Sequence, residues 1–353
     1  MPHISVIIDN YNYASFLGQA LDSVLAQSFS DFECLVVDDG SDDNSIEIIE
    51  QYTRIDKRVR SVLKKNGGQT SAFSAGFARA SGEIVAFLDS DDFWYPQKLE
   101  HIVAAHRSNR IVQHYLAPNG QGIYRKIRED LNRRDALLTY GYMYNHSPCS
   151  ALSFTKECIA PFFPLQQPER MRGYSDGCLL MLAMTRAEVC VLPDVLGYYR
   201  IHGKNMHVDK TDKGPKSRKI FQAQREYVNL QLRHRGFSEI PFSDTAYIAS
   251  RLTRHASTLH KKKHLFVYGT EAAGKSVTTV LVDMGLSVFA YVDSDAAKWG
   301  QDFSGKAVLS PNQLGEFTDV DMGVIIASSA VQPITETLYT LGIDDDHILV
   351  LDI

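Results

Sequence analysis

The sequence predicts an α/β protein in which a helical connector joins two parallel-sheet domains. In the first hundred residues, apolar runs typical of buried parallel strands alternate with helical patterns. Each of these runs ends in polar residues, as expected at the ligand-binding edge of an open sheet. A second strand–turn–helix pattern begins near residue 264, and a chain of 353 residues is long enough for two domains.

The first domain contains four expected strands, at residues 4–8, 32–37, 59–63 and 83–88. A helical pattern covers residues 16–25, between the first two strands. The next helix opens at Ser41 or Asn44, and a helix rich in small residues covers 71–80. No G-x-G-x-x-G follows the first strand, which disfavours an ordinary dinucleotide-binding fold in this domain.

The most informative segment is the apolar run 83–88, which leads directly into Asp89-Ser90-Asp91-Asp92. Three carboxylates crowded at one strand end repel each other unless a cation lies between them. Their hard oxygen atoms suit Mg²⁺ or Mn²⁺, which in turn can hold a diphosphate. The alternative is a solvated acidic turn in which Asp92 caps the next helix.

Residues 1 to about 205 resemble the family 2 glycosyltransferases of the GT-A fold. The matching segments, in order, are Ser5-Val6-Ile7-Ile8 with Tyr11-Asn12, Val36-Val37-Asp38-Asp39-Gly40-Ser41, Asn66-Gly67-Gly68-Gln69, Gly82-Glu83, Phe87-Leu88-Asp89-Ser90-Asp91-Asp92 and Tyr198-Tyr199-Arg200-Ile201-His202-Gly203. Each segment is short, and their order and spacing together carry the resemblance. One departure is Asp9, at a position where such enzymes usually have proline or another neutral residue.

The resemblance implies a donor site for a nucleotide-diphospho-sugar. It places Asp89 near the ribose, Asp91 on a divalent cation (Mn²⁺ or Mg²⁺), and Asp39 on the nucleobase. The remaining residues implied in nucleotide binding are Tyr11, Asp38, Gly67 and Gln69. Residues 38–41 also fit an Asx turn, which is the structural alternative for both Asp38 and Asp39.

Attack on the sugar needs a base that takes a proton from the acceptor hydroxyl. The resemblance places this base at Asp176 in Tyr174-Ser175-Asp176-Gly177, where Ser175 replaces a usual glutamate. Asp176 could equally be an acidic residue favoured by the N-terminal end of a helix.

The resemblance makes His202 a further candidate, as a metal or diphosphate contact, and neutral imidazole is a competent ligand. The alternative is a structural or solvated histidine, since the chain has twelve. Arg200 and Lys204 beside it could contact phosphate oxygens or be plain surface charges.

Residues 107–145 are charged and less regular. The resemblance implies that this region and the part through Gln167 face the acceptor, a glycan or a lipid-linked molecule. Processive polysaccharide synthases carry Q-x-x-R-W and membrane helices. Here Gln222-Ala223-Gln224-Arg225 is followed by Glu226, which favours a single-transfer enzyme.

Composition agrees with a cytoplasmic enzyme. The net charge of −5 leaves no basic surplus for nucleic acid, and no apolar run approaches a membrane span. The first strand begins almost at Met1, so no signal peptide is expected. The five cysteines lack C-x-x-C spacing and indicate reduced, mostly buried thiols.

Three domains are expected: a GT-A domain at 1–205, a helical and basic connector at 206–262, and a small Rossmann-like parallel α/β domain at 263–353. Lys261-Lys262-Lys263 lies at the boundary between the connector and the last domain. This basic segment could contact anionic lipid at the inner face of the membrane, or could be a solvated helix end.

The C-terminal domain opens with an expected strand at 264–268. The turn that follows, residues 269–276, satisfies the P-loop pattern G-x-x-x-x-G-K-[ST]. The domain also resembles a Rossmann-type half-domain, with Gly269 and Gly274 in the turn and Asp293 where a ribose-binding acid would lie. The usual middle glycine is missing. A second nucleotide site at Gly269, Gly274, Lys275 and Asp293 is therefore one interpretation. A docking or homodimerisation element with an empty cleft is the other.

The function predicted is a metal-dependent, non-processive glycosyl transfer in bacterial surface glycan or polysaccharide synthesis, and the resemblance implies that the transfer inverts the configuration of the sugar. Two alternatives remain from the sequence. One is a P-loop phosphotransferase activity of the C-terminal domain. The other is a nucleotide-sugar-binding scaffold or regulator with weakened catalysis, to which Ser175 in place of glutamate would point.

Overall fold

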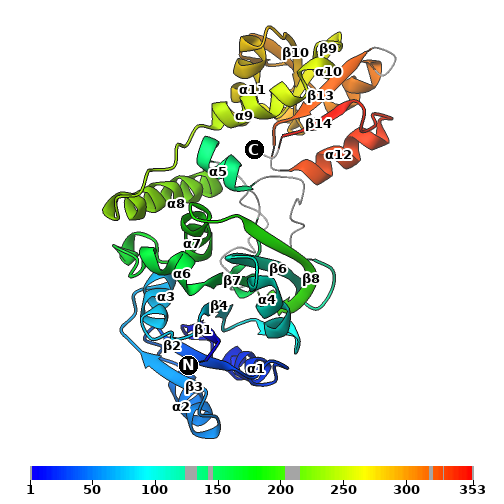
Figure 1. Cartoon of the computed structure of the whole chain (residues 1–353). Coiled ribbons are helices and arrows are strands. Elements are labelled where there is room, and N and C mark those ends of the chain that lie inside the picture. The colour runs from blue at the N-terminus through cyan, green and yellow to red at the C-terminus, as the bar shows by residue number, and fades with distance from the viewer. Residues whose placement is uncertain are drawn as a thin grey trace. The chain divides into compact units, whose positions relative to one another are not determined.

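The computed structural model describes residues 2–123, 133–141, 146–202, 215–317, 321–328 and 330–351 (Figure 1). The chain divides into two compact units, one made of Met1–Thr139 with Met143–Ile240 and the other of Tyr140–Tyr142 with Pro241–Ile353. The stretch expected as a connector is shared between them. Helix α8 (Pro215–His234) belongs to the first unit, and α9 (Asp244–Arg254) belongs to the second.

In the first unit, strands and helices alternate along the chain from β1 to β4, and the later elements do not follow this alternation. Its strands are β1 (Ile4–Asn10), β2 (Phe32–Asp38), β3 (Val59–Leu63), β4 (Ile84–Asp89), β5 (Phe93–Trp94), β6 (Ile111–Pro118), β7 (Leu152–Thr155) and β8 (Val189–Tyr199). Its other helices are α1 (Ala14–Leu25), α2 (Ser45–Ile55), α3 (Gln69–Phe77), α4 (Lys98–His106), α5 (Arg133–Tyr140), α6 (Lys156–Ile159) and α7 (Ser175–Met184), with 3₁₀ turns η1 (Cys149–Ala151), η2 (Ala160–Phe162) and η3 (Pro168–Arg170).

These strands form one sheet in the order β3-β2-β1-β4-β7-β6-β8-β5 (Figure 1). The first four are parallel, whereas β7 is antiparallel to both β4 and β6. This is an α/β fold of the GT-A type, as the sequence predicted. The four predicted strands are its parallel half, and their carboxyl ends meet at one edge.

Strand alternation assigns each side chain of β1 to one of the two faces of the sheet. Ile4, Val6 and Ile8 lie in a buried core together with residues of α1, α2 and α4. The opposite face receives α3, where Gly76 lies so close to Ile7 that a Cβ would meet its methyl at 2.7 Å. The α3 face is therefore the face on which the next alternate residue of β1, Asp9, projects.

The irregular region expected at 107–145 contains β6, so that expectation was wrong for residues 111–118. The strand carries Gln113 and His114, which are both fully buried and interrupt its apolar pattern. Gln113 accepts a hydrogen bond from the backbone N–H of Ser147, 3.1 Å away. Buried polar residues of this kind hide a central strand from periodicity arguments. Residues 124–132 and 142–145 of the same region lie outside the described part of the chain.

The second unit is a smaller sheet in the order β11-β12-β10-β9-β13-β14, parallel except for β11 against β12. Its strands are β9 (His264–Tyr268), β10 (Val288–Val292), β11 (Asp302–Phe303), β12 (Lys306–Leu309), β13 (Met322–Ile326) and β14 (Ile348–Val350). Its remaining helices are α10 (Ala256–Leu259), α11 (Ala272–Asp283) and α12 (Val331–Thr340), with 3₁₀ turns η4 (Ala296–Lys298) and η5 (Pro311–Phe317).

The P-loop pattern at 269–276 does not form an open loop. Helix α11 already begins at Ala272, and the N–H of Lys275 donates to the carbonyl of Glu271 within the helix. Gly274 packs on the carbonyl of Gly269, where a Cβ would lie 1.9 Å from that oxygen. Close helix–strand packing of this kind is the role of a glycine in a Rossmann-type turn.

Among the described residues, no helix combines the length and apolar character that crossing a membrane requires. All five cysteines are free thiols, and four of them are buried.

Candidate active site

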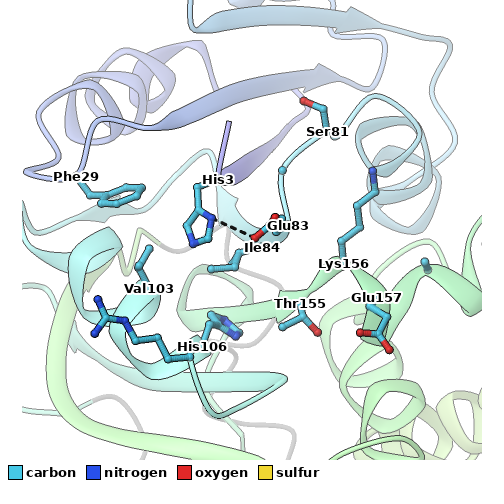
Figure 2. Close-up of a pocket in the computed structure, with 13 residues that line it drawn as sticks. His3, Phe29, Ser81, Glu83, Ile84, Val103, His106, Thr155, Lys156 and Glu157 are labelled. Atoms are coloured by element: carbon cyan, nitrogen blue, oxygen red, sulfur yellow. Dashed lines mark ion pairs between the residues drawn. The ribbon is translucent and has the colours of Figure 1, made fainter. Parts of the chain in front are cut away.

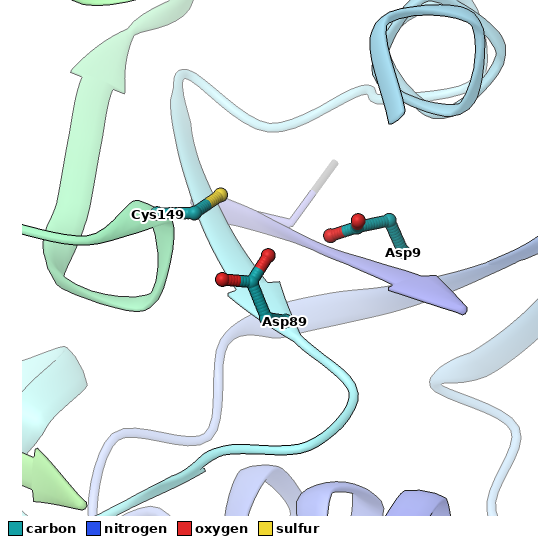
Figure 3. A group of neighbouring side chains, drawn as sticks. All are labelled: Asp9, Asp89 and Cys149. Carbon is teal, nitrogen blue, oxygen red and sulfur yellow. The ribbon is translucent and has the colours of Figure 1, made fainter. Parts of the chain in front are cut away.

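The site begins with two aspartates that lie side by side. Asp9 in β1 and Asp89 at the end of β4 are register partners in neighbouring parallel strands. Figure 3 shows both carboxyl groups and the Cys149 thiol of η1 converging on one space. One ligand atom from each of the three lies within 4.8 Å of the others. Burial raises the pKa of Cys149 well above its usual range, so that residue is a thiol there and not a thiolate.

Asp89, Asp91 and Asp92 form a second, overlapping group whose ligand atoms also lie within 4.8 Å of one another. Asp92 is buried and accepts hydrogen bonds from the Ser150 hydroxyl at 2.6 Å and the Arg200 N–H at 2.9 Å. Asp91 lines the pocket, and its Oδ2 lies 2.9 Å from Nε2 of His202. Asp92 is therefore held by the protein, while Asp89 and Asp91 are the better candidates for a cation.

The crowding of these acids shows in their pKa values. Burial is the main cause that raises the pKa of Asp9 to about 7. A hydrogen bond from Gln69 lowers this pKa, and the negative charge of Asp91 raises it. Burial and the neighbouring carboxylates hold the pKa of Asp89 well above its usual range. Without a bound cation, the cluster is most stable when it retains a proton.

His202, which the sequence offered as a metal contact, lies beside the acidic turn. Its Nε2 is 2.9 Å from Oδ2 of Asp91, and its ring stacks on Phe16 with 5.0 Å between ring centroids. Arg200 does not reach outward as a free phosphate ligand, because its Nε donates to the Asp91 carbonyl at 2.7 Å. The segment after β8 therefore closes against the acidic turn. Gly203 and Lys204, which the sequence also indicated, lie outside the described residues.

A pocket of about 630 Å³ opens beside these acids, and its lining includes Asp9, Tyr11, Asp39, Gln69, Asp89 and Asp91. Tyr11 is 47% exposed, so its ring is free to contact a ligand. Asp39 lines the pocket but already accepts from the Gly67 N–H at 2.9 Å and the Gly68 N–H at 2.6 Å. Lys64 also contacts Asp39. Asp39 thus holds the 66–69 segment against the pocket.

Asp38 occupies a different environment from Asp39. It is buried, and it accepts from the N–H groups of Gly40 and Ser41 and from the Asn10 amide at 2.9 Å. These are the contacts of the Asx turn that the sequence left as an alternative. In the described pocket lining, Asp39 contributes and Asp38 does not.

The predicted base lies on the first turn of α7. Asp176 is partly exposed, and its charge contributes to the raised pKa of Asp89. Its neighbour Ser175 is buried and meets the hydroxyl of Thr70, with 2.6 Å between the two oxygens. Burial and this contact suit the small hydroxyl side chain of serine at this position. Asp176 supplies the carboxylate at this helix end.

Ser150 and Arg172 are site residues that sequence reasoning missed. The Ser150 hydroxyl accepts from the Asp89 N–H at 3.1 Å and donates to Asp92, and its carbonyl accepts from the Trp94 indole. Arg172 lines the pocket and contacts Asn66. Neither residue belongs to a recognisable motif, and both lie more than fifty residues from their partners.

A second cavity, of about 880 Å³, lies at the amino ends of β1 and β4 (Figure 2). His3 and Glu83 form an ion pair there at 3.3 Å. Burial lowers the pKa of His106 to about 4, and its Nε2 lies 2.9 Å from the Ser153 hydroxyl. This cavity is larger than the first, but the strand-end acids are at the other edge of the sheet.

Comparison with known proteins identifies the family of this chain. The Glycosyl transferase family 2 sequence model matches residues 5–158. An uncharacterized glycosyltransferase of Nostoc sp. is 38% identical over 244 residues, which covers 64% of this chain and 74% of that protein. The chain belongs to glycosyltransferase family 2.

Two further similarities fit this family 2 glycosyltransferase. Poly(ribitol-phosphate) β-N-acetylglucosaminyltransferase TarS of Staphylococcus aureus is 27% identical over 222 residues, which cover 61% of this chain and only 38% of TarS. The crystal structure of TarS 1–349 with UDP-GlcNAc has a TM-score of 0.51 at 19% identity and covers 80% of each chain. The structural likeness supports the GT-A fold.

The C-terminal unit of the glycosyltransferase matches a separate sequence model, "C2185-like, N-terminal", over residues 261–349. Asp293 lies at the end of β10, as the Rossmann-type resemblance implied. Its carboxylate is occupied by the protein itself, since it accepts from the Thr270 N–H at 3.2 Å, the Asp295 N–H at 2.9 Å and Lys298 Nζ at 3.1 Å. These contacts lock the turn between β9 and α11.

Proposed function

We propose that this family 2 enzyme is a metal-dependent, inverting, non-processive glycosyltransferase that moves a sugar from a nucleotide-diphospho-sugar to an acceptor hydroxyl. The observation that carries the proposal is the group of Asp89, Asp91 and Asp92 at the end of β4, next to the pocket of about 630 Å³. An acidic strand end facing a pocket of this size suits a divalent cation and the diphosphate of a donor.

The residues present fit a divalent cation. Asp89 and Asp91 offer hard oxygen ligands. The Nε2 atom of His202 lies within hydrogen-bonding distance of Asp91, at 2.9 Å, and is the nearby nitrogen ligand. A bound Mn²⁺ or Mg²⁺ would stabilise the negative charge that develops on the leaving diphosphate. The protein itself holds the backbone of these ligand residues. Ser150 accepts the backbone N–H of Asp89, and Arg200 donates to the backbone carbonyl of Asp91.

Asp176 is the proposed base. It takes the proton of the acceptor hydroxyl as the acceptor oxygen forms a bond to the anomeric carbon, while the bond from that carbon to the diphosphate oxygen breaks. Attack from the face opposite the diphosphate inverts the configuration. No covalent enzyme intermediate is required, because one base serves a single displacement.

Similar proteins suggest which donors and acceptors to test first. TarS was crystallised with UDP-GlcNAc, and a Bacillus subtilis relative is named a putative teichuronic acid biosynthesis glycosyltransferase, TuaG. We therefore propose a UDP-sugar donor and a bacterial surface glycan as acceptor, with the enzyme acting on the cytoplasmic side. In the basic segment 261–263, Lys262 pairs with Asp321 at 3.0 Å. This pairing reduces the positive charge that the segment could offer to anionic lipid.

The proposal is tested by thermal unfolding with a panel of UDP-, GDP- and dTDP-sugars, with and without Mn²⁺. A ligand at 100 times its Kd adds about 2.7 kcal/mol to stability, so the correct donor should raise the melting temperature clearly. Asp91→Ala should remove the Mn²⁺-dependent part of this rise. Its unliganded stability should hold or increase, because one repelling carboxylate has gone.

Turnover of the best donor must then accompany binding. Donor binding without any transfer to acceptors would favour a nucleotide-sugar-binding scaffold instead. Normal, Mn²⁺-dependent transfer by Asp91→Ala would show that the cation is held elsewhere.

A further inference from the structure

Asp9 has no role in the reaction described so far, yet it lies within the site. It lines the donor pocket, and strand alternation directs its side chain to the α3 face together with that of Asp89. Burying one carboxyl group beside another costs free energy, because burial and the neighbouring negative charge both disfavour ionisation. Its Oδ1 is buried without a hydrogen-bond partner among the described residues, so the contact that matters is made by Oδ2.

That contact is with Gln69, the first residue of α3. The Gln69 amide nitrogen lies 3.3 Å from Oδ2 of Asp9 and 3.1 Å from Oδ1 of Asp89. Its two N–H groups are therefore divided between the two carboxyl groups. The amide oxygen accepts the backbone N–H of Ser175 at 3.3 Å. A flip of the amide would place its oxygen against the oxygens of the two carboxyl groups and its N–H groups against the N–H of Ser175. These neighbours therefore fix the orientation of the amide.

Ser175 is the first residue of α7, and Asp176 follows it directly. The same two helix ends meet again where the Thr70 and Ser175 hydroxyls lie 2.6 Å apart. A continuous hydrogen-bonded chain thus runs from the carboxyl ends of β1 and β4, through the start of α3, to the start of α7. It spans residues 9, 69 and 175, which lie far apart in the sequence.

We propose that Asp9 is a positioning residue that acts through Gln69 to set the start of α7, and with it Asp176, relative to the donor site. Asp89 cannot serve this purpose alone, because a carboxylate that turns toward a cation or donor releases Gln69. Asp9 then remains as the acceptor that keeps the amide oriented. This inference rests on the proposed role of Asp176 as the base.

The test compares transfer kinetics of Asp9→Ala and Asp9→Asn with the wild-type full chain, using UDP with Mn²⁺ as the probe for donor-site affinity. A base displaced by about 1 Å can lose about 10²-fold in rate. We expect Asp9→Ala to lower kcat by about 10- to 100-fold while the Kd for UDP with Mn²⁺ stays within about threefold of wild type. Asp9→Asn should lose less, because its side-chain oxygen can still accept from Gln69.

Asp31→Ala is the matched control, an exposed aspartate just before β2 at the opposite edge of the sheet. It should behave as wild type. Gln69→Leu breaks the same chain from the α3 side and serves if Asp9→Ala fails to fold. In a double-mutant cycle, Asp9→Ala should add little to the kcat loss already caused by Gln69→Leu.

Three outcomes would overturn the inference. Asp9→Ala could match Asp31→Ala in kcat, its effect could add fully to that of Gln69→Leu, or its main effect could be on UDP affinity. Asp176→Asn in the same assay separates this from the proposed function. If Asp176→Asn retains transfer, the base assignment fails. If Asp176→Asn is inactive and Asp9→Ala is normal, only the positioning role fails.

Discussion

Four aspartates share the carboxyl ends of β1 and β4, and each has a different task set by its immediate contacts. Asp92 is buried against Ser150 and Arg200, and it shapes the turn. Asp91 pairs with His202 at 2.9 Å, at the pocket. Asp9 and Asp89 share the amide of Gln69. Residue type alone does not separate these roles, but hydrogen-bond partners do.

Asp176→Asn should lower kcat for sugar transfer by about 10²-fold or more, because the amide cannot accept the hydroxyl proton at neutral pH. The donor Kd should barely change, since the base contacts the acceptor. Steady-state transfer kinetics together with calorimetric titration of UDP would check both parts. Equal losses in donor affinity and in kcat would assign Asp176 a structural role at the start of α7.

The raised pKa of Asp9 predicts a pH-dependent stability in the cation-free protein. Its pKa is about 7 in the folded state, against about 3.9 for an unperturbed aspartate. Between these values the folded protein keeps a proton that the unfolded chain has released, so the free energy of unfolding falls as pH rises. Asp9→Asn lacks this contribution. Its stability relative to wild type should therefore increase by up to about 4 kcal/mol between about pH 4 and pH 7.

Urea unfolding of both proteins in chelator across that pH range measures the difference. A difference that stays constant with pH would show that Asp9 ionises in the folded state as it does in the unfolded chain.

At the scale of elements, the starts of two helices do most of the positioning. Helix α3 begins at Gln69 and approaches the sheet closely at Gly76, while α7 begins at Ser175 against α3. In the second unit, α11 begins at Ala272, directly after a three-residue turn that Asp293 holds. In both units, a strand-end aspartate is hydrogen-bonded to a residue at or just before the start of a helix that follows a different strand.

The turn between β9 and α11 gives an element-scale prediction. Lys275 is exposed on α11, so Lys275→Ala should change stability by no more than about 0.5 kcal/mol and sugar transfer by no more than a few-fold. Asp293→Ala leaves the Thr270 N–H without its acceptor and should destabilise the second unit by about 1–3 kcal/mol. Chemical unfolding and calorimetry with ATP and Mg²⁺ provide the measurements. Mg²⁺-dependent micromolar ATP binding that Lys275→Ala abolishes would instead reveal a working P-loop.

At the scale of the whole molecule, each unit has its own hydrophobic core. One core packs α1, α2 and α4 on the first sheet, and another packs Leu314, Ile334 and Leu338 on the second. The acids, the pocket and Asp176 all belong to the first unit. Donor binding should therefore stabilise that unit directly.

Differential scanning calorimetry of the full chain should show two transitions. UDP with Mn²⁺ should move one of them upward, by mass action, and leave the other within error. Asp91→Ala should remove the shift, while Lys275→Ala should leave it intact. A single transition that moves as a whole would mean that the two units unfold cooperatively.

Much of the fold follows from local patterns. The strands at the amino-terminal end of the chain, the helices between them and the acidic end of β4 were predictable, because apolar runs and strand-end polar residues are properties of short segments. Strand β6 was missed, since Gln113 and His114 break its apolar run. The P-loop pattern did not predict the start of α11 at Ala272, because a pattern of residue types does not fix where a helix starts.

The sequence by itself determined the family, the fold class and the strand end that carries the acids. The tertiary structure was needed to show that Asp39 lines the pocket while Asp38 closes a turn, and that the Ser150 hydroxyl contacts both Asp89 and Asp92. The reason is the range of the interactions. Strand and helix patterns arise between near neighbours in the chain, whereas a hydrogen bond such as that between residues 69 and 175 forms only after the intervening elements have packed.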